Sequence, residues 1–185
     1  SNLRVVNDHE IEGLRRSRAW AQNQRVYFVL RTSKPFRPLL AVGDTVRDEL
    51  TAAAGKNLKA ALRFDTRPGE VVEVKVGISA VDIEGARRNL DEELPGWDFE
   101  LTHQAARATW RQQLDKIEIE GGTPDQRTIF YTALYHTMIQ PNTWSDVDHR
   151  FRGRDDQVHT ADGYTRYTVF SLWDTFRAAH PLYTI

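Results

Sequence analysis

Cysteine is absent from the 185 residues of this chain, which excludes disulfide-stapled folds, thiolate nucleophiles and Cys-ligated zinc sites. A metal ion would therefore need oxygen or imidazole ligands. No stretch of the sequence approaches the roughly 18 consecutive apolar residues of a membrane span. Lys and Arg number 25 against 26 Asp and Glu, and this balance argues against nucleic-acid partners, which favour a basic excess. Glycine-rich phosphate loops and nucleophile elbows are also missing.

Hydrophobic residues make up 40% of the chain, enough to bury a core in one domain or two small ones. The first part, residues 1–79, is typical of β structure. Residues 25–31 are rich in strand formers, and apolar and polar residues alternate over 60–65 and 72–78. Such alternation places one face of a strand on a core and the other in water, so we expect an antiparallel sheet or one sandwich layer. Turn signals separate the runs at 33–35, 42–44 and 67–69.

The period of the hydrophobic pattern changes after Ser79. Ser79 followed by Asp82, in place of the usual Glu or Gln, resembles a capping box and predicts a helix start with Ser79 as the cap. We expect this helix to end at Pro95-Gly96. A second helix is expected from about Asp98, because a stripe of apolar residues at helical spacing follows it.

The strongest helix start is the segment 123–126, Thr-Pro-Asp-Gln, where a capping threonine, a first-turn proline and a capping-box glutamine coincide. We expect this helix to run to about Gln140, because Pro141 follows it. A last helix is predicted near 171–179. So few helices cannot bury their own apolar faces, and the chain ends on the apolar run 181–185, so we expect the natural polypeptide to continue.

Five aspartates gather in a short polar stretch and allow two interpretations. They are Asp146, Asp148, Asp155, Asp156 and Asp162. Closely spaced carboxylates can bind calcium, but these lack the Gly and Glu positions of an EF-hand loop. A polar hairpin with aspartates at its turn, near residues 154–156, is favoured instead.

The segment 171–177, Ser-Leu-Trp-Asp-Thr-Phe-Arg, also allows two interpretations. On a helix, Asp174 and Arg177 lie one turn apart and can pair beside a buried Trp173. Alternatively, these three side chains form a sugar subsite, in which the indole packs on C–H groups and the charged groups bond hydroxyls. Spacing alone favours the buried ion pair. Further amide and aromatic groups stand on predicted loops, where function often resides: Asn142, Trp144, Tyr164 and Tyr167.

Several motifs stand in a fixed order along the second half of the chain. They are Phe130-Tyr131-Thr132-Ala133-Leu134-Tyr135-His136, Pro141-Asn142, Ser145-Asp146-Val147-Asp148 and the run from Ser171 to Leu182. Together they resemble glycoside hydrolase family 92, whose members are exo-acting, calcium-dependent, inverting α-mannosidases. The likeness covers residues 70–185 well and residues 1–70 loosely. His149 and Asp156 stand where the family commonly has glycine.

The resemblance implies an α+β multidomain plan. Residues 1–79 would be the C-terminal part of an antiparallel β-sandwich, 80–116 a helical linker, and 117–185 the start of an (α/α)6 barrel. The division at Ser79 agrees with the change of period found there.

The resemblance also suggests roles for single residues. Trp173 and Asp174 match a family motif that lines the mannose pocket, and Arg177 matches less closely, as a residue that orients Asp174. His136 and Asp146 match family positions whose roles we leave unassigned. The family's general acid, general base and main calcium ligands lie downstream, so no catalytic or metal-binding residue is placed on this chain.

The leading hypothesis is therefore that this chain is a fragment of a secreted or periplasmic α-mannosidase, which removes α-linked mannose from glycans such as N-glycans. We expect these residues to be inactive alone and to work with the rest of their own polypeptide. One alternative is a non-catalytic carbohydrate-binding module formed by residues 1–79, and another is a structural fragment without a ligand. Mannoside binding by residues 1–79 that survives Trp173→Ala would favour the binding module.

Overall fold

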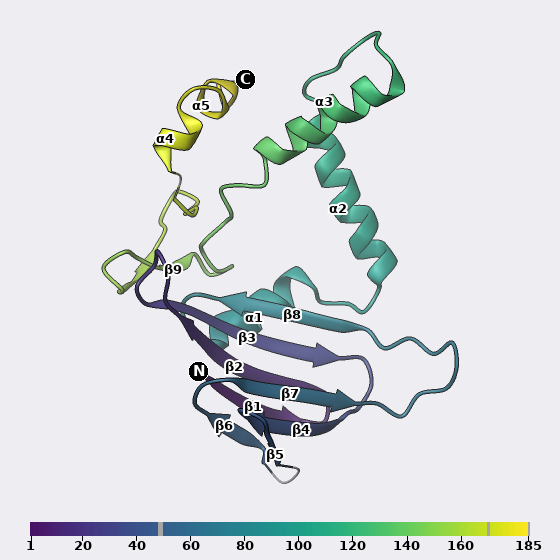
Figure 1. The fold of residues 1–185 in the computed structure, drawn as a ribbon, viewed down its shortest axis with the longest axis vertical. Coiled ribbons are helices and arrows are strands. Elements are labelled where there is room, and N and C mark those ends of the chain that lie inside the picture. The colour runs from purple at the N-terminus through teal and green to yellow at the C-terminus, as the bar shows by residue number, and fades with distance from the viewer. Residues whose placement is uncertain (48–49, 170, 185) are drawn as a thin grey trace. The chain divides into compact units, whose positions relative to one another are not determined.

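The structure is a computed structural model that describes residues 1–47, 50–169 and 171–184 (Figure 1). Ile185, the last residue of the apolar terminal run, lies outside the described residues. None of the helices in these ranges combines the length and apolar character needed to cross a bilayer. The chain divides into two compact units, residues 1–97 with 145–165 and residues 98–144 with 166–185.

The first unit is built on β-strands. In chain order they are β1 (Asn2–Asn7), β2 (Glu10–Ser17), β3 (Gln24–Thr32), β4 (Arg37–Val42), β5 (Thr45–Arg47), β6 (Ala52–Ala54), β7 (Leu58–Arg63), β8 (Val74–Ser79), β9 (Arg150–Arg152) and β10 (Val158–Thr160). One sheet has the order β6-β1-β2-β3-β8, a second has the order β5-β4-β7, and β9 and β10 form a hairpin. These pairings are antiparallel, which confirms the antiparallel structure predicted for residues 1–79.

The alternation in β8 is present, but the face that is buried is the one with the small residues. Gly77 and Ser79 are buried, whereas Val74, Val76 and Ile78 are between 46% and 60% exposed. The reason is the helix that follows the strand and packs on its Gly77 face. A Cβ atom at Gly77 would lie 2.2 Å from the carbonyl oxygen of Ala86. The missing side chain is therefore what allows the helix to lie so close to the sheet.

That helix is α1 (Ile83–Glu93), and it packs on the larger sheet through a small apolar core. Val29 of β3 and Ala86 and Leu90 of α1 are each no more than 1% exposed. Asp82 caps the helix, because its carboxylate accepts a hydrogen bond from the Gly85 amide at 2.6 Å. The cap predicted at Ser79 is thus wrong, since the Ser79 hydroxyl is engaged elsewhere.

A buried ionic cluster, which the sequence did not reveal, also joins α1 to the sheet. Glu10 and Glu12 of β2 are only 5% and 2% exposed. Arg87 of α1 reaches both, and its Nη2 lies 2.6 Å from Glu12 Oε2. Arg31 of β3 donates to Glu10 at 2.5 Å. Burial alone would raise the pKa of Glu10, but the hydrogen bonds and charges of the two arginines outweigh it and lower that pKa.

The second unit contains α2 (Phe99–Leu114) and α3 (Pro124–Thr137). Asp98 caps α2, and the predicted capping box between Thr123 and Gln126 is present at the start of α3. The two helices meet at Trp110 and Tyr135, whose ring centroids are 4.6 Å apart. Leu134 is the buried residue of α3 and α2 has none, which agrees with the expectation that so few helices cannot cover their own apolar faces.

The last predicted helix is wrong in its extent. The structure has two single turns, α4 (Leu172–Thr175) and α5 (Ala179–Leu182), in place of one helix over 171–179. Ala178, at φ −132° and ψ −51°, interrupts them. Ser171 makes no side-chain cap, and an exposed segment this short lacks the packing that sustains a helix.

Gly77 offers a direct test of the contact between β8 and α1. We expect Gly77→Ala to lower the free energy of unfolding by about 3 kcal/mol, the upper end of overpacking costs, because a Cβ would meet backbone and side chain of α1. Urea denaturation followed by tryptophan fluorescence measures it. Val76→Ala, on the exposed face of the same strand, is the control, and equal losses in the two variants would contradict this packing.

Candidate functional site

The three residues predicted to contact sugar lie on and just after α4, and all of them are exposed. Trp173 and Asp174 belong to the helical turn and Arg177 follows it. The Trp173 side chain is 79% exposed. The buried-tryptophan interpretation is therefore wrong, and within the described residues no salt bridge joins Asp174 to Arg177. An indole beside an open carboxylate and guanidinium is compatible with a sugar subsite, which stays a prediction.

The loops on either side of the β9–β10 hairpin are tied together near Asn142 and Trp144. The Trp144 amide donates to the Arg166 carbonyl oxygen at 2.7 Å. Asn142 donates through its amide to Thr168 Oγ1 at 3.0 Å and accepts from the Thr168 amide at 2.9 Å. Tyr167 pairs with Thr143 in an isolated bridge. The sequence singled out Asn142, Trp144 and Tyr167 for their side chains. In the structure their backbones also pair the segment before the hairpin with the segment after it.

The aspartates between 146 and 156 belong to a polar hairpin, as favoured from the sequence. Asp146 is 6% exposed and sits where the hairpin meets α1 and the end of β8. Ser79 Oγ donates to its Oδ2 at 2.7 Å, and Asn89 Nδ2 donates to its Oδ1 at 3.0 Å. A Cβ at Gly85 would stand 2.3 Å from Oδ2. We call this group, Ser79, Asn89 and Asp146, the carboxyl latch.

Burial shapes the titration of the carboxyl latch. Desolvation raises the pKa of Asp146, and the hydrogen bonds from Ser79 and Asn89 offset this only in part. A carboxyl with a raised folded-state pKa adds stability below its unfolded-state pKa, and that stability is lost as the pH rises through the folded-state pKa. Burial thus makes the charged form of Asp146 more costly than it is in water. The Asn89 side chain also accepts a hydrogen bond from the Val147 amide at 2.9 Å.

Asp148, two residues along, has the opposite electrostatic setting. Arg150 Nε lies 2.8 Å and Arg88 Nη2 lies 2.7 Å from its Oδ2. Burial by itself would raise the pKa of Asp148, but the hydrogen bonds and charge of Arg150 lower it. Arg150 also reaches the helix cap Asp82 at 3.0 Å. This carboxylate thus adds stability above its unfolded-state pKa, which is lost as the pH falls through the folded-state pKa.

The two positions where the family commonly has glycine adopt left-handed backbone conformations. His149 has φ 65° and Asp156 has φ 62°, a region that favours glycine and tolerates Asn, Asp and His better than other residues. Asp156 has further partners at the end of the β2–β3 loop and the start of β3, because its Oδ2 accepts from Asn23 Nδ2 and Arg25 Nη2, both at 2.7 Å. The sequence difference is therefore accommodated by residues that can occupy this conformation.

The described residues do not fit a calcium site. Among residues 1–47, 50–169 and 171–184, no group of three or more His, Asp or Glu side chains is placed to hold a metal ion. Arginine and hydroxyl or amide groups already engage Asp146, Asp148 and Asp156.

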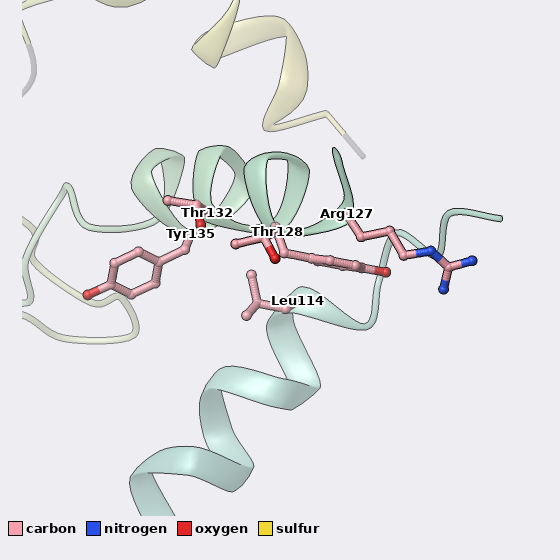
Figure 2. A pocket seen from close by; sticks show the side chains of 6 residues that line it. Leu114, Arg127, Thr128, Thr132 and Tyr135 are labelled. Carbon is pink, nitrogen blue, oxygen red and sulfur yellow. The ribbon is translucent and has the colours of Figure 1, made fainter. Parts of the chain in front are cut away.

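An open hollow of about 440 Å³ between α2 and α3 is the other candidate (Figure 2). It is lined by Leu114, Arg127, Thr128, Tyr131, Thr132 and Tyr135. Figure 2 shows Leu114, at the end of α2, facing the α3 side chains. Arg127 Nε donates to the Gly121 carbonyl oxygen at 2.9 Å. The six lining residues include no carboxylate, so the hollow contains no carboxyl group that could act as an acid or base.

Asp146 and Asp148 are expected to differ in the sign of their pH dependence. Relative to the wild type, Asp146→Asn should gain stability as the pH rises, because the amide removes the cost of burying a charge, although one of the two donors loses its acceptor. Asp148→Asn should lower the free energy of unfolding at neutral pH and lose this effect in acid. Urea denaturation of both variants and the wild type between about pH 3 and pH 7 measures the difference. Parallel curves for the two variants would refute these electrostatic assignments.

The left-handed positions give a second pair of matched variants. His149→Gly should raise the free energy of unfolding by up to about 1 kcal/mol, because glycine occupies φ 65° without strain. Asp156→Gly relieves a similar conformation but removes the acceptor for Asn23 and Arg25, so it should lower the melting temperature. Asp156→Asn, which keeps an acceptor, is the control. A gain in stability from both glycine variants would show that the Asp156 contacts contribute nothing.

Two family models match this chain. The glycosyl hydrolase family 92 N-terminal domain model matches residues 1–79, and the glycosyl hydrolase family 92 catalytic domain model matches residues 85–185. An uncharacterised secreted glycosidase from Arthroderma benhamiae is 37% identical over 79 aligned residues, and the match covers 40% of this chain and 10% of that protein.

Solved structures are similar over almost the whole chain. A family GH92 α-mannosidase from Bacteroides thetaiotaomicron is 39% identical, with a TM-score of 0.89 over 98% of this chain and 25% of its own. It has also been solved in complex with mannoimidazole. A family GH92 inverting mannosidase from Bacteroides thetaiotaomicron VPI-5482 is 30% identical, with a TM-score of 0.91 over 99% of this chain and 26% of its own. The chain thus spans about a quarter of the length of these relatives.

Proposed function

Because the chain belongs to glycoside hydrolase family 92, we propose that residues 1–185 form part of an inverting glycosidase that removes α-linked mannose from glycans. The observation that carries this proposal is the match of both family models, in order, along the chain. The relatives support it further, since one is named an α-mannosidase and another an inverting mannosidase.

In such an enzyme, a carboxylic acid protonates the leaving glycosidic oxygen while a carboxylate activates water on the opposite face of the sugar. The two carboxyl groups stand about 6.5–9.5 Å apart to leave room for that water. We place both outside residues 1–185, in the part of the relatives' length that this chain does not span. The described carboxylates of the hairpin support this assignment, because arginine, hydroxyl and amide partners already occupy them.

The proposed domain plan follows the family. Residues 1–79 belong to a β-sandwich domain, residues 80–116 to a helical linker, and residues 117–185 to the first part of an (α/α)6 catalytic domain. The exposed valine face of β8 and the uncovered faces of α2 and α3 support this plan, because surfaces of this kind are normally covered in a complete domain.

We assign the sugar contact to the segment that contains α4. Trp173 presents its indole to the C–H face of a mannose ring, and Asp174 accepts hydrogen bonds from ring hydroxyls. We propose that Arg177, three residues after Asp174 and beyond the end of α4, orients Asp174 in the longer enzyme. The exposure of all three side chains supports this assignment, because a ligand can reach them.

Calcium serves the longer enzyme in this proposal, with its ligands mainly downstream of residue 185. The ion would bind sugar hydroxyls and help to distort the ring. The partners are mannose-containing glycans and the rest of the same polypeptide. A secreted or periplasmic location is proposed from the secreted glycosidase to which residues of this chain are similar.

The sugar contact can be tested in the longer protein that this proposal implies. Asp174→Asn should lower kcat/KM for an α-mannoside by about 10²-fold, because it weakens a charged hydrogen bond that strengthens in the transition state. Trp173→Ala should lower it at least tenfold, and Arg177→Lys less. Steady-state release of mannose is the measurement.

Two controls accompany this measurement. Trp97→Ala alters a tryptophan of the first unit, whose ring lies beneath the Lys75 ammonium, and should leave kcat/KM unchanged. Residues 1–185 alone, with calcium present, should release no mannose. Calcium-dependent release by these residues alone, or full activity of Asp174→Asn, would count against the proposal.

A further inference from the structure

The loop between β2 and β3 displays one side chain in an unusual way. Trp20 is fully exposed, at 102% of its reference area. Residues 7–41 are all described by the structure, and Trp20 is the one large apolar side chain among them that is exposed. Its sequence neighbours Ala19 and Ala21 are small, so neither adds bulk beside the indole.

The loop that holds Trp20 is braced by hydrogen bonds. The Ala19 amide donates to the Ala21 carbonyl oxygen at 3.1 Å, across the tryptophan. Arg18 Nε donates to Gln22 Oε1 at 2.8 Å on the two sides of the turn. Trp20 therefore stands at the tip of a closed turn, and its exposure does not result from a lack of local structure.

A second hairpin fixes the base of this loop. Asn23 and Arg25 both donate to Asp156 Oδ2 of the β9–β10 turn at 2.7 Å. Asp156 holds this position with a left-handed backbone, φ 62°, and Arg152 donates to its carbonyl oxygen at 2.8 Å. The loop is thus anchored to a part of the chain more than a hundred residues away. This anchor holds the Trp20 loop in one conformation before any ligand binds.

The size of the apolar surface favours a sugar over a protein partner. A tryptophan supplies about 150–250 Å², whereas a stable protein interface buries about 800 Å² on each side. A single indole with two open faces matches the area of one pyranose ring, whose C–H groups pack on aromatic faces. Arg18, two residues before Trp20 in the same loop, has further N–H groups beyond the one that bonds Gln22.

We propose that Trp20, together with Arg18 of the same loop, is a stacking platform for a pyranose ring of a glycan. Trp20 belongs to the first unit and Trp173 to the second, and the proposal does not depend on the catalytic assignment. The platform would hold a sugar residue of a glycan weakly and reversibly. The Trp20 indole would stack on the C–H face of the ring, and the Arg18 guanidinium would donate hydrogen bonds to its hydroxyls.

Tryptophan indole NMR of the 185-residue chain, titrated with mannotetraose, tests this proposal. The chain has five tryptophans, so each Nε1–H signal reports on its own site. We expect the Trp20 signal to shift saturably at millimolar sugar, in the wild type and equally in Trp173→Ala. A shift at Trp173 alone would overturn the platform while supporting the proposed catalytic pocket, so the two failures are distinguishable.

Variants make the test specific. Trp20→Ala should weaken mannotetraose binding to the first unit at least tenfold by calorimetry, and Trp20→Tyr, which restores an aromatic face, should bind within threefold of the wild type. Because Trp20 is fully exposed, neither change should alter the melting temperature. An unmoved Trp20 signal would overturn the proposal. So would a signal that moves with protein concentration in the absence of sugar, since that indicates a protein contact.

Discussion

The hydrogen bonds around the buried Asp146 carboxyl join three parts of the first unit that are distant in sequence. Ser79 ends β8, Asn89 lies on α1, and Asp146 begins the hairpin that returns to them. A buried carboxyl is tolerated only when its oxygens have partners, and here each oxygen has one. Gly85 leaves the space that the carboxyl occupies. The hairpin is therefore part of the first unit, although α2 and α3 of the second unit precede it in the chain.

The other acidic residues of the hairpin extend this arrangement. Asp148 pairs with arginines of the hairpin and of α1, and Asp156 holds the base of the loop that displays Trp20. Aspartates that could have suggested calcium thus serve as anchors for other elements. The two proposed sugar contacts depend on different parts of the chain, since Trp20 belongs to the first unit and Trp173 to the second.

Local signals predicted much of the fold. The capping box at Thr123 and the strand-forming run that became β3 are both found, because caps and alternation act within a few residues. The buried face of β8 was not predictable, since it depends on α1 approaching Gly77. The role of Ser79 was missed because its partner Asp146 is 67 residues away. The exposure of Trp173 could not be read from its spacing either, because burial is a property of tertiary packing.

Hydrogen exchange in Asp146→Ala tests most directly whether the carboxyl latch fixes the hairpin. The amides of Gly153 and Ala161 donate within the hairpin at 2.8 Å, and both should be protected in the wild type. We predict that their exchange accelerates at least tenfold in the variant, while the amides of α3, in the second unit, keep their rates. Unchanged protection of Gly153 and Ala161 would contradict the claim that Asp146 holds the hairpin in place.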